Sequence, residues 1–267
     1  MSDTALPIDK PSLGVGRILG DAFSLVGRNF IPMMIVGIIP AGVGVAMNLA
    51  LYGAVSQNPI LAFTDPGQYL KSVGVVGPFV QFLTAFLGVL LWGFGTASMI
   101  EAAYSAANGR QVSVGRAIST GIRNIGGVCI CMVISGIAIY IGLVLLILPG
   151  LYLCALWFVI IPAVVVEKSG FGAFERSKLL TREYRWQLVG LIFLYGLVLI
   201  VLMLVTAAAQ YIAFLMGSVG LVFGTAFSVL YASFFYALSG ALFALTYARL
   251  TEIKEGTSMQ NLADVFS

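Results

Sequence analysis

The sequence predicts an all-α integral membrane protein with six transmembrane helices, and three observations carry this prediction. Hydrophobic residues make up 60% of the 267 positions and charged residues 9%, far below the roughly 25% charge of soluble domains. The mean hydropathy is +1.03. Long runs such as IGLVLLIL and LVLIVLMLV are apolar at every position, without the alternation of a membrane β-strand, so the spans are expected to be helices.

Six apolar runs approach or exceed the length of about 20 helical residues that crosses about 30 Å of hydrocarbon. They lie at 31–52, 76–104, 125–147, 150–166, 186–209 and 218–247. The fourth run is short, and Pro149-Gly150 is expected to make a tight turn between it and the third. All six runs belong to one membrane domain, residues 1–267.

The basic residues collect on one side of these runs. Of the 14 Lys and Arg residues, 13 precede the first run, separate the second from the third or the fourth from the fifth, or follow the sixth; only Lys71 lies on the other side. Cytoplasmic flanks of membrane helices are enriched in Lys and Arg. The distribution therefore predicts that both termini are cytoplasmic.

Amphipathic segments precede runs one, three and five. They read SLGVGRILGDAFSLVGRNF, SVGRAISTGIRNIGG and SGFGAFERSKLLTREYRW. The helical period separates apolar residues from Arg residues in the first two segments. In the third, Ala173, Phe174, Leu180 and Tyr184 form the apolar face, and Phe171, Leu179 and Trp186 fall outside it. We expect three repeats of an interfacial helix followed by a transmembrane hairpin (12–52 with 76–104, 113–166, 170–247), closed by an amphipathic helix at 257–266.

Interfacial helices lie in the headgroup plane with their basic side toward anionic lipid, at about 1 kcal/mol per well-placed cation. This predicts membrane lipids with anionic headgroups as partners, together with other membrane proteins at the same surface. In the third segment Phe174, Leu180 and Tyr184 are expected to dip toward the acyl chains. The alternative is that these segments are connectors packed on the helix bundle. The expected contact residues are Arg17, Arg28, Arg116, Arg123, Arg176, Lys178, Arg182 and Arg185.

Two carboxylates, Glu101 and Glu167, end apolar runs just before basic segments. Ion pairing with the neighbouring arginines is the expected role, and a cation or headgroup site is the alternative. Tyrosines near the span ends are expected to anchor at the membrane interface. They are Tyr104, Tyr140, Tyr195 and Tyr247.

The sixth run has small residues at four-residue spacing. Such a stripe lets another helix approach closely, either within the chain or across a homodimer seam. The stripe comprises Gly220, Gly224, Ser228, Ala232 and Gly240.

Several kinds of chemistry are missing from the sequence. It has no histidine, no Walker lysine motif, and three cysteines without a CxxC pair. No catalytic residue, metal or cofactor is therefore predicted, and no nucleic acid as partner. Coupled transporters usually keep ionisable residues at mid-depth, and none is found there. Polar residues toward the outer span ends would line a shallow cavity in a carrier: Asn48, Gln57, Gln81 and Gln210.

Residues 148 to 186, LPGLYLCALWFVIIPAVVVEKSGFGAFERSKLLTREYRW, resemble a recurring bacterial pattern. The matching positions are Pro149, Gly150, Glu167, Ala173, Ser177, Leu180, Thr181 and Trp186. The resemblance is to the family of the membrane domain of glycerophosphoryl diester phosphodiesterases and the related YciC-like inner-membrane proteins. GRILGDAFSLVGRNF and EIKEGTSMQNLADVF are similar to the opening helix and tail of that family. This chain has Glu183 where a small or glycine-like residue is expected after the Leu-Thr pair.

The resemblance implies a location in the bacterial inner membrane. It does not imply phosphodiesterase activity, because that belongs to a separate soluble domain that residues 248–267 cannot hold. The leading hypothesis is a non-catalytic protein that contacts lipid as a scaffold or as a partner of envelope proteins. The alternative is a permease or flippase-like carrier of an apolar or amphipathic solute. A ligand-sized polar cavity between spans would favour the carrier, and a packed bundle would favour the scaffold.

Overall fold

The computed structural model describes residues 12–52, 65–74 and 77–256, and this part of the chain contains helices and short connections but no strand. Six helical segments are long and apolar enough to cross a membrane: Phe30–Tyr52, Pro78–Ala107, Val114–Leu145, Ile147–Glu167, Arg185–Leu215 and Val219–Glu255. Each of them overlaps one of the six expected runs, so the all-α membrane fold is confirmed. The amphipathic helix expected at 257–266 lies outside the described residues.

The long helices form three pairs, and these pairs also pack extensively on one another. The first half of the chain forms α1 (Val15–Arg28), α2 (Phe30–Tyr52), α4 (Pro66–Gly74) and α5 (Pro78–Ala107). The second half forms α6 (Val114–Leu145), α7 (Ile147–Leu156), α8 (Ile160–Glu167), α9 (Gly172–Thr181), α10 (Arg185–Leu215) and α11 (Gly217–Glu255). Helix α2 packs on α5, α6 on α7, and α10 on α11.

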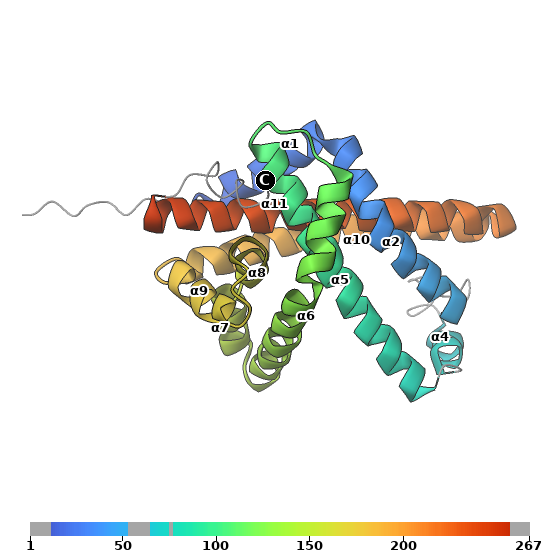
Figure 1. The fold of residues 1–267 in the computed structure, drawn as a ribbon. Coiled ribbons are helices and arrows are strands. Elements are labelled where there is room, and N and C mark those ends of the chain that lie inside the picture. Colours follow the sequence, from blue (N-terminus) through green and yellow to red (C-terminus); the bar gives the residue numbers. More distant parts are fainter. Residues whose placement is uncertain (1–11, 53–64, 75–76, 257–267) are drawn as a thin grey trace, which may run out of the picture.

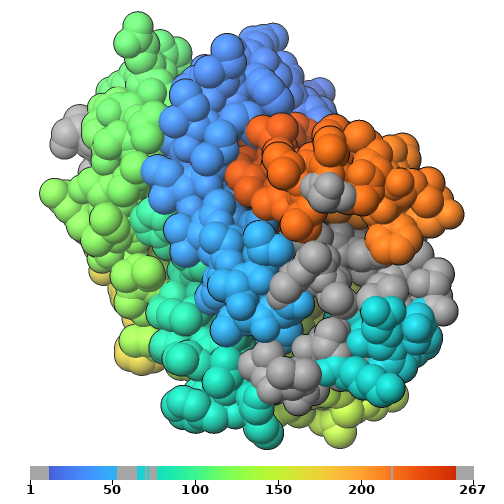
Figure 2. All heavy atoms as spheres, turned by 90° about the vertical axis from the view of Figure 1, so that its right-hand side faces the viewer, coloured from blue at the N-terminus to red at the C-terminus, as the bar shows by residue number. Residues whose placement is uncertain are grey.

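These three pairs meet at one end and separate at the other. In Figure 1 the separated ends of α10 and α11 lie to the right, those of α2 and α5 at the lower right, and those of α6 and α7 at the bottom. Seen from the right, the first part of α11 (orange) lies beside α2 (blue), with α6 (green) at the opposite edge (Figure 2). We call the joined ends the basic ends, because every described Lys and Arg except Lys71 belongs to them, and the others the far ends.

Burial is concentrated at the basic ends. In α5 every residue from 95 to 105 is buried, and none from 78 to 92 is. Tyr104 of α5 is fully buried and donates a hydrogen bond of 3.3 Å to the carbonyl of Ala244 in α11. Glycine allows α5 and α11 to approach this closely, because a Cβ at Gly95 would lie only 2.6 Å from the ring of Tyr236. The hydrophobic effect does not drive helix association in lipid, so close packing of this kind has to stabilise the bundle instead.

The small-residue stripe of α11 faces other helices of the same chain. Gly240 contacts Met99 of α5, and a Cβ at Gly224 would lie 2.6 Å from Gln210 Oε1 of α10. Gly220 packs in the same way on the α10 backbone, Ser228 accepts a hydrogen bond from α10, and Ala232 lies beside α2. The three glycines of the stripe are buried, so a second copy of the chain cannot reach them.

The second amphipathic segment does not form a helix of its own, unlike the first (α1) and the third (α9). Residues from Val114 onward belong to α6, which continues without a break to Leu145. The segment contains no proline, and its Gly126-Gly127 pair stays helical, so nothing interrupts the ladder of backbone hydrogen bonds. The separate interfacial helix expected before the second hairpin is therefore absent from the described chain.

The fourth span also differs from the prediction. The turn before it lies at Leu146, and Pro149 occupies the first turn of α7, where a missing amide hydrogen breaks no helical bond. The span is then divided between α7 and α8. Pro162 explains this division, because its ring cannot donate to the carbonyl of Phe158 and would clash with it in a continuous helix.

Candidate functional site at the basic ends

The carboxylate of Glu101 is fully buried where α5 meets α6. Its Oε1 accepts a hydrogen bond of 2.9 Å from Ser105 and lies 3.8 Å from Nε of Arg116. Its Oε2 has no hydrogen-bond partner among the described residues. The ion pair expected between this carboxylate and a neighbouring arginine is present. It joins α5 to α6, and a loss of Arg116 would leave an uncompensated charge in the interior.

Arg176 of α9 is held between two carboxylates. Its Nε donates to Glu167 at 2.6 Å, its Nη2 donates to Glu255 at 2.8 Å, and Nη1 makes a second bond to Glu255. Tyr247 also donates to Glu167. These bonds raise the pKa of Arg176, with the larger contribution from Glu255. Arg176 therefore ties α9 to α8 and α11 instead of being free for lipid headgroups, which corrects the prediction for this residue.

Two other bases are engaged within the chain. Arg185 donates to the hydroxyl of Tyr152, and its guanidinium carbon lies 4.9 Å from the centre of that ring. Lys254 pairs with Glu183 at 3.3 Å. Glu183 has φ of 76°, the left-handed conformation that favours glycine, so the position expected to be glycine-like is conformationally glycine-like.

Five of the predicted contact residues stay exposed and form no side-chain hydrogen bond or ion pair within the described part of the chain. They are Arg17, Arg28, Arg123, Lys178 and Arg182. The predicted contact residues thus divide into a paired set, Arg116, Arg176 and Arg185, which joins helices at the basic ends, and a free set, the five residues just named.

The apolar face predicted for the third segment packs inside the protein and does not reach lipid. Leu180 and Tyr184 are 1% and 4% exposed, and Phe174 packs edge-on against Trp157 with ring centres 5.5 Å apart. Helices α7, α8 and α11 pack against α9. The apolar side chains left exposed are those outside the face: Phe171 (68%), Leu179 (53%) and Trp186 (75%).

Helix α1 is also covered by protein on its apolar side. Ile18, Leu19, Ala22 and Val26 are buried, and the helix packs on α11 and α10. For this segment the structure agrees with the alternative of a connector packed on the bundle.

Three of the four tyrosines expected at the interface are buried instead. Tyr104 bonds to α11, Tyr195 shares a 2.6 Å hydrogen bond with Ser239, and Tyr247 bonds to Glu167. Only Tyr140, at 69%, is exposed. For Tyr247 the stripe of small residues already indicated burial, since Tyr247 lies seven positions after Gly240 and therefore on the same face of α11.

The polar residues that were expected to line one outer cavity lie in different environments. Gln210 is 4% exposed and donates to the carbonyl of Gly224 at 2.9 Å and to Ser228 at 2.6 Å. Asn48 lines a pocket of about 320 Å³ between α2 and α11. Gln81 is exposed on α5, and Gln57 lies outside the described residues.

The six long apolar helices define the class of the molecule, a multi-pass all-α membrane protein. Searches of known protein families, curated proteins and solved structures gave no match to this chain. The family resemblance of residues 148 to 186 therefore stays a prediction, and the function has to be argued from the geometry of the site.

Proposed function

We propose that the protein is a non-catalytic membrane scaffold that binds anionic lipid headgroups at its basic ends. One stretch of the chain, residues 171–186, carries the proposal. In it two exposed cations, Lys178 and Arg182, accompany three exposed apolar side chains, Phe171, Leu179 and Trp186. We call these five residues the α9 patch.

The composition of the α9 patch suits the boundary between headgroups and acyl chains. Trp prefers this depth because its ring is apolar while its indole N–H is polar, and Lys and Arg side chains reach outward to phosphate groups. Each free cation near an anionic surface contributes about 1 kcal/mol. The attraction is smaller than the sequence suggests, since Arg176 and Arg185 are engaged within the protein and the exposed Glu175 opposes it.

Quenching of tryptophan fluorescence by brominated lipid tests this proposal. The chain has three tryptophans, so Trp92→Phe and Trp157→Phe leave Trp186 as the sole fluorophore. In mixed bilayers, brominated phosphatidylglycerol should quench Trp186 more than brominated phosphatidylcholine does. Replacing Lys178 and Arg182 with Gln should remove this preference, because the cations recruit the anionic lipid.

Lys71→Gln is the matched control, because Lys71 is an exposed lysine at the far end of the molecule. It should leave the quenching preference of Trp186 unchanged. If no brominated lipid quenches Trp186, the α9 patch does not lie in the membrane interface and the proposal fails in favour of a protein-docking surface.

A second candidate function, a carrier of an apolar or amphipathic solute, is supported by the 320 Å³ pocket between α2 and α11. Small and polar residues line it, among them Gly44, Asn48 and Ser228. If the pocket carries a solute, purified protein in proteoliposomes should accelerate the movement of a fluorescent lipid between leaflets, and Asn48→Leu should slow that movement. Equal rates with and without protein would reject a lipid carrier.

A further inference from the structure

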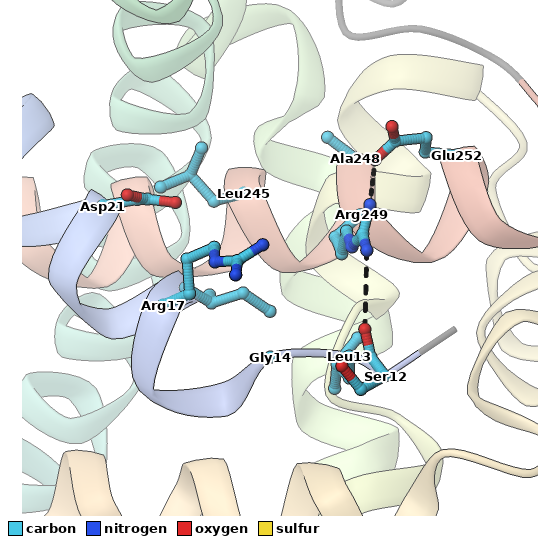
Figure 3. A pocket seen from close by; sticks show the side chains of 10 residues that line it. Ser12, Leu13, Gly14, Arg17, Asp21, Leu245, Ala248, Arg249 and Glu252 are labelled. Carbon is cyan, nitrogen blue, oxygen red and sulfur yellow. Dashed lines mark hydrogen bonds and ion pairs between the residues drawn. The ribbon is translucent and has the colours of Figure 1, made fainter. Parts of the chain in front are cut away.

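A pocket between the start of α1 and the last turns of α11 combines both signs of charge. It has a volume of about 310 Å³, within the range of about 300–1,000 Å³ that is usual for ligand sites (Figure 3). Its charged lining residues are Arg17 and Asp21 from α1 and Arg249 and Glu252 from α11. The pocket is thus electrically neutral, although it lies among the basic ends.

The α11 pair in this pocket is already satisfied. Nη1 of Arg249 lies 2.7 Å from Glu252, and Nη2 donates to the carbonyl of Ser12 at 3.5 Å. This pair joins the chain just before α1 to α11. It therefore forms a wall of the pocket and leaves little charge for a ligand.

The α1 pair is not satisfied. Arg17 and Asp21 are one helical turn apart, yet they do not form an ion pair with each other or with any other described residue. In Figure 3 the guanidinium of Arg17 extends into the space between α1 and α11, and the carboxylate of Asp21 lies farther along α1, beside Leu245. The pocket thus presents a free cation at one place and a free anion at another.

The start of α1 reinforces the positive part of the pocket. The chain enters the helix at Gly14, with φ of 70° and no side-chain cap on the first turn. The partial positive charge of the helix start therefore adds to the charge of Arg17 and favours an oxyanion. A ligand that carries only negative charge would be repelled by Asp21, so this arrangement favours a ligand with one group of each sign.

We propose that this pocket binds a zwitterionic phosphate and primary-ammonium group, with the phosphate at Arg17 and the ammonium at Asp21. A primary ammonium can donate hydrogen bonds to the carboxylate, whereas a quaternary ammonium cannot, so the pocket discriminates between them. The inference deepens the proposed function. It rests on that proposal, because it assumes that the basic ends lie among lipid headgroups. The same chemistry occurs in a lipid headgroup and in free phosphoethanolamine.

Native mass spectrometry of the delipidated full-length protein, titrated with defined lipids, tests the pocket. The wild type should bind one phosphatidylethanolamine about tenfold more tightly than phosphatidylcholine. Arg17→Gln should weaken the binding of both lipids about tenfold, because it removes the phosphate partner. Asp21→Asn should remove only the preference between the two lipids. Arg28→Gln, an exposed arginine on the same helix but outside the pocket, should change neither value.

Competition with soluble phosphoethanolamine distinguishes the two sources of the ligand. If it binds the wild type but not Arg17→Gln and displaces the lipid, the pocket accepts the free compound; if only the lipid binds, the ligand is a headgroup. Phosphatidylethanolamine binding that is unchanged in both Arg17→Gln and Asp21→Asn would overturn the proposal, as would tighter Arg17-dependent binding of phosphatidylglycerol.

The same titration separates this pocket from the α9 patch. Replacing Lys178 and Arg182 with Gln should lower the number of bound phosphatidylglycerol molecules and leave phosphatidylethanolamine binding intact. A failure of that result alone rejects the proposed function, and a failure of the Arg17 and Asp21 results alone rejects the pocket.

Discussion

Along α5, Met99 and Tyr104 are fully buried at the basic end, whereas Phe79, about 20 residues earlier, is 76% exposed. The contrast recurs along α11, where Leu238 is fully buried and Val222 is 72% exposed. In water the exposed ends would be unstable, but in lipid an exposed apolar side chain costs nothing. The feature that needs a physical explanation is therefore the packed end, not the open one.

The basic ends combine two kinds of interaction. Glycines bring the backbones into contact, as Gly240 does on Met99, and charged pairs such as Glu255 with Arg176 join helices that are distant in sequence. The far ends also contain close glycine contacts, such as Gly220 on Ala213 and Gly150 on Leu143, and the buried amide of Gln210 bonds there to α11. Among the described residues, however, the far ends contain no ion pair between helices, and fewer of their side chains are buried. The basic ends should therefore carry most of the stability of the fold.

The largest loss of stability is expected for Gly240→Leu. The new side chain would collide with Met99, including its backbone, so α11 would have to move away from α5. The free energy of unfolding should fall by about 3 kcal/mol, at the upper end of typical overpacking costs. Thermal unfolding in detergent measures the change.

Gly136→Leu is the matched control for that substitution, because nothing lies within 4 Å of a Cβ at this position of α6. It should not lower the midpoint of unfolding. Equal losses for both variants would mean that the two regions do not differ in packing.

A smaller loss is expected for Arg176→Gln. The substitution leaves Glu167 and Glu255 without their shared cation, and Arg176 is 22% exposed, so solvent screens part of the cost. We expect a decrease of about 1–2 kcal/mol in the free energy of unfolding.

Lys178→Gln, on the same helix, should change the free energy of unfolding by less than about 0.5 kcal/mol, because Lys178 is exposed and unpaired in the described structure. An equal effect of the two substitutions would contradict the division of the basic residues into a paired and a free set.

At the far ends, Gly224→Leu should cost about 1 kcal/mol, the lower end of overpacking costs. The atom that the new Cβ would meet is Oε1 of Gln210, the end of a flexible side chain that can move. The melting profile in detergent measures this, and no change would show that the first half of α11 does not pack on α10.

The sequence predicts the fold through composition, because a run of about 20 apolar residues has few stable states other than a membrane helix. The sequence is less informative about where a helix is interrupted. The break between α7 and α8 follows from Pro162, which is an ordinary signal, but the same residue type at Pro40 stays inside α2. Whether a proline ends a helix depends on neighbouring helices, which periodicity does not reveal.

For a similar reason, the sequence predicted only part of the candidate site. Charge counting located the basic ends and the arginine partners of Glu101 and Glu167. It could not separate Arg176, which is paired, from Arg182, which is free, because one partner of Arg176 is Glu255 of α11, 79 residues away in sequence. An amphipathic pattern likewise shows which side of α9 is apolar, but not whether lipid or protein covers it.

The smallest effect that still tests the comparison is that of Gln210→Leu. The side chain of Gln210 donates two hydrogen bonds to α11 at 2.9 and 2.6 Å, and it is 4% exposed. Hydrogen bonds between membrane helices contribute about 0.6 kcal/mol on average, because an amide in the separated state also finds partners. Leucine has a similar length and loses only those bonds, so the free energy of unfolding should fall by about 0.6 kcal/mol. Hydrogen exchange of the far-end amides in α10 and α11 would accelerate with it, while exchange of the 95–105 segment of α5 would not. If exchange accelerated equally at both ends, the helices would open as one unit, and the difference between the basic and far ends would be one of exposure alone.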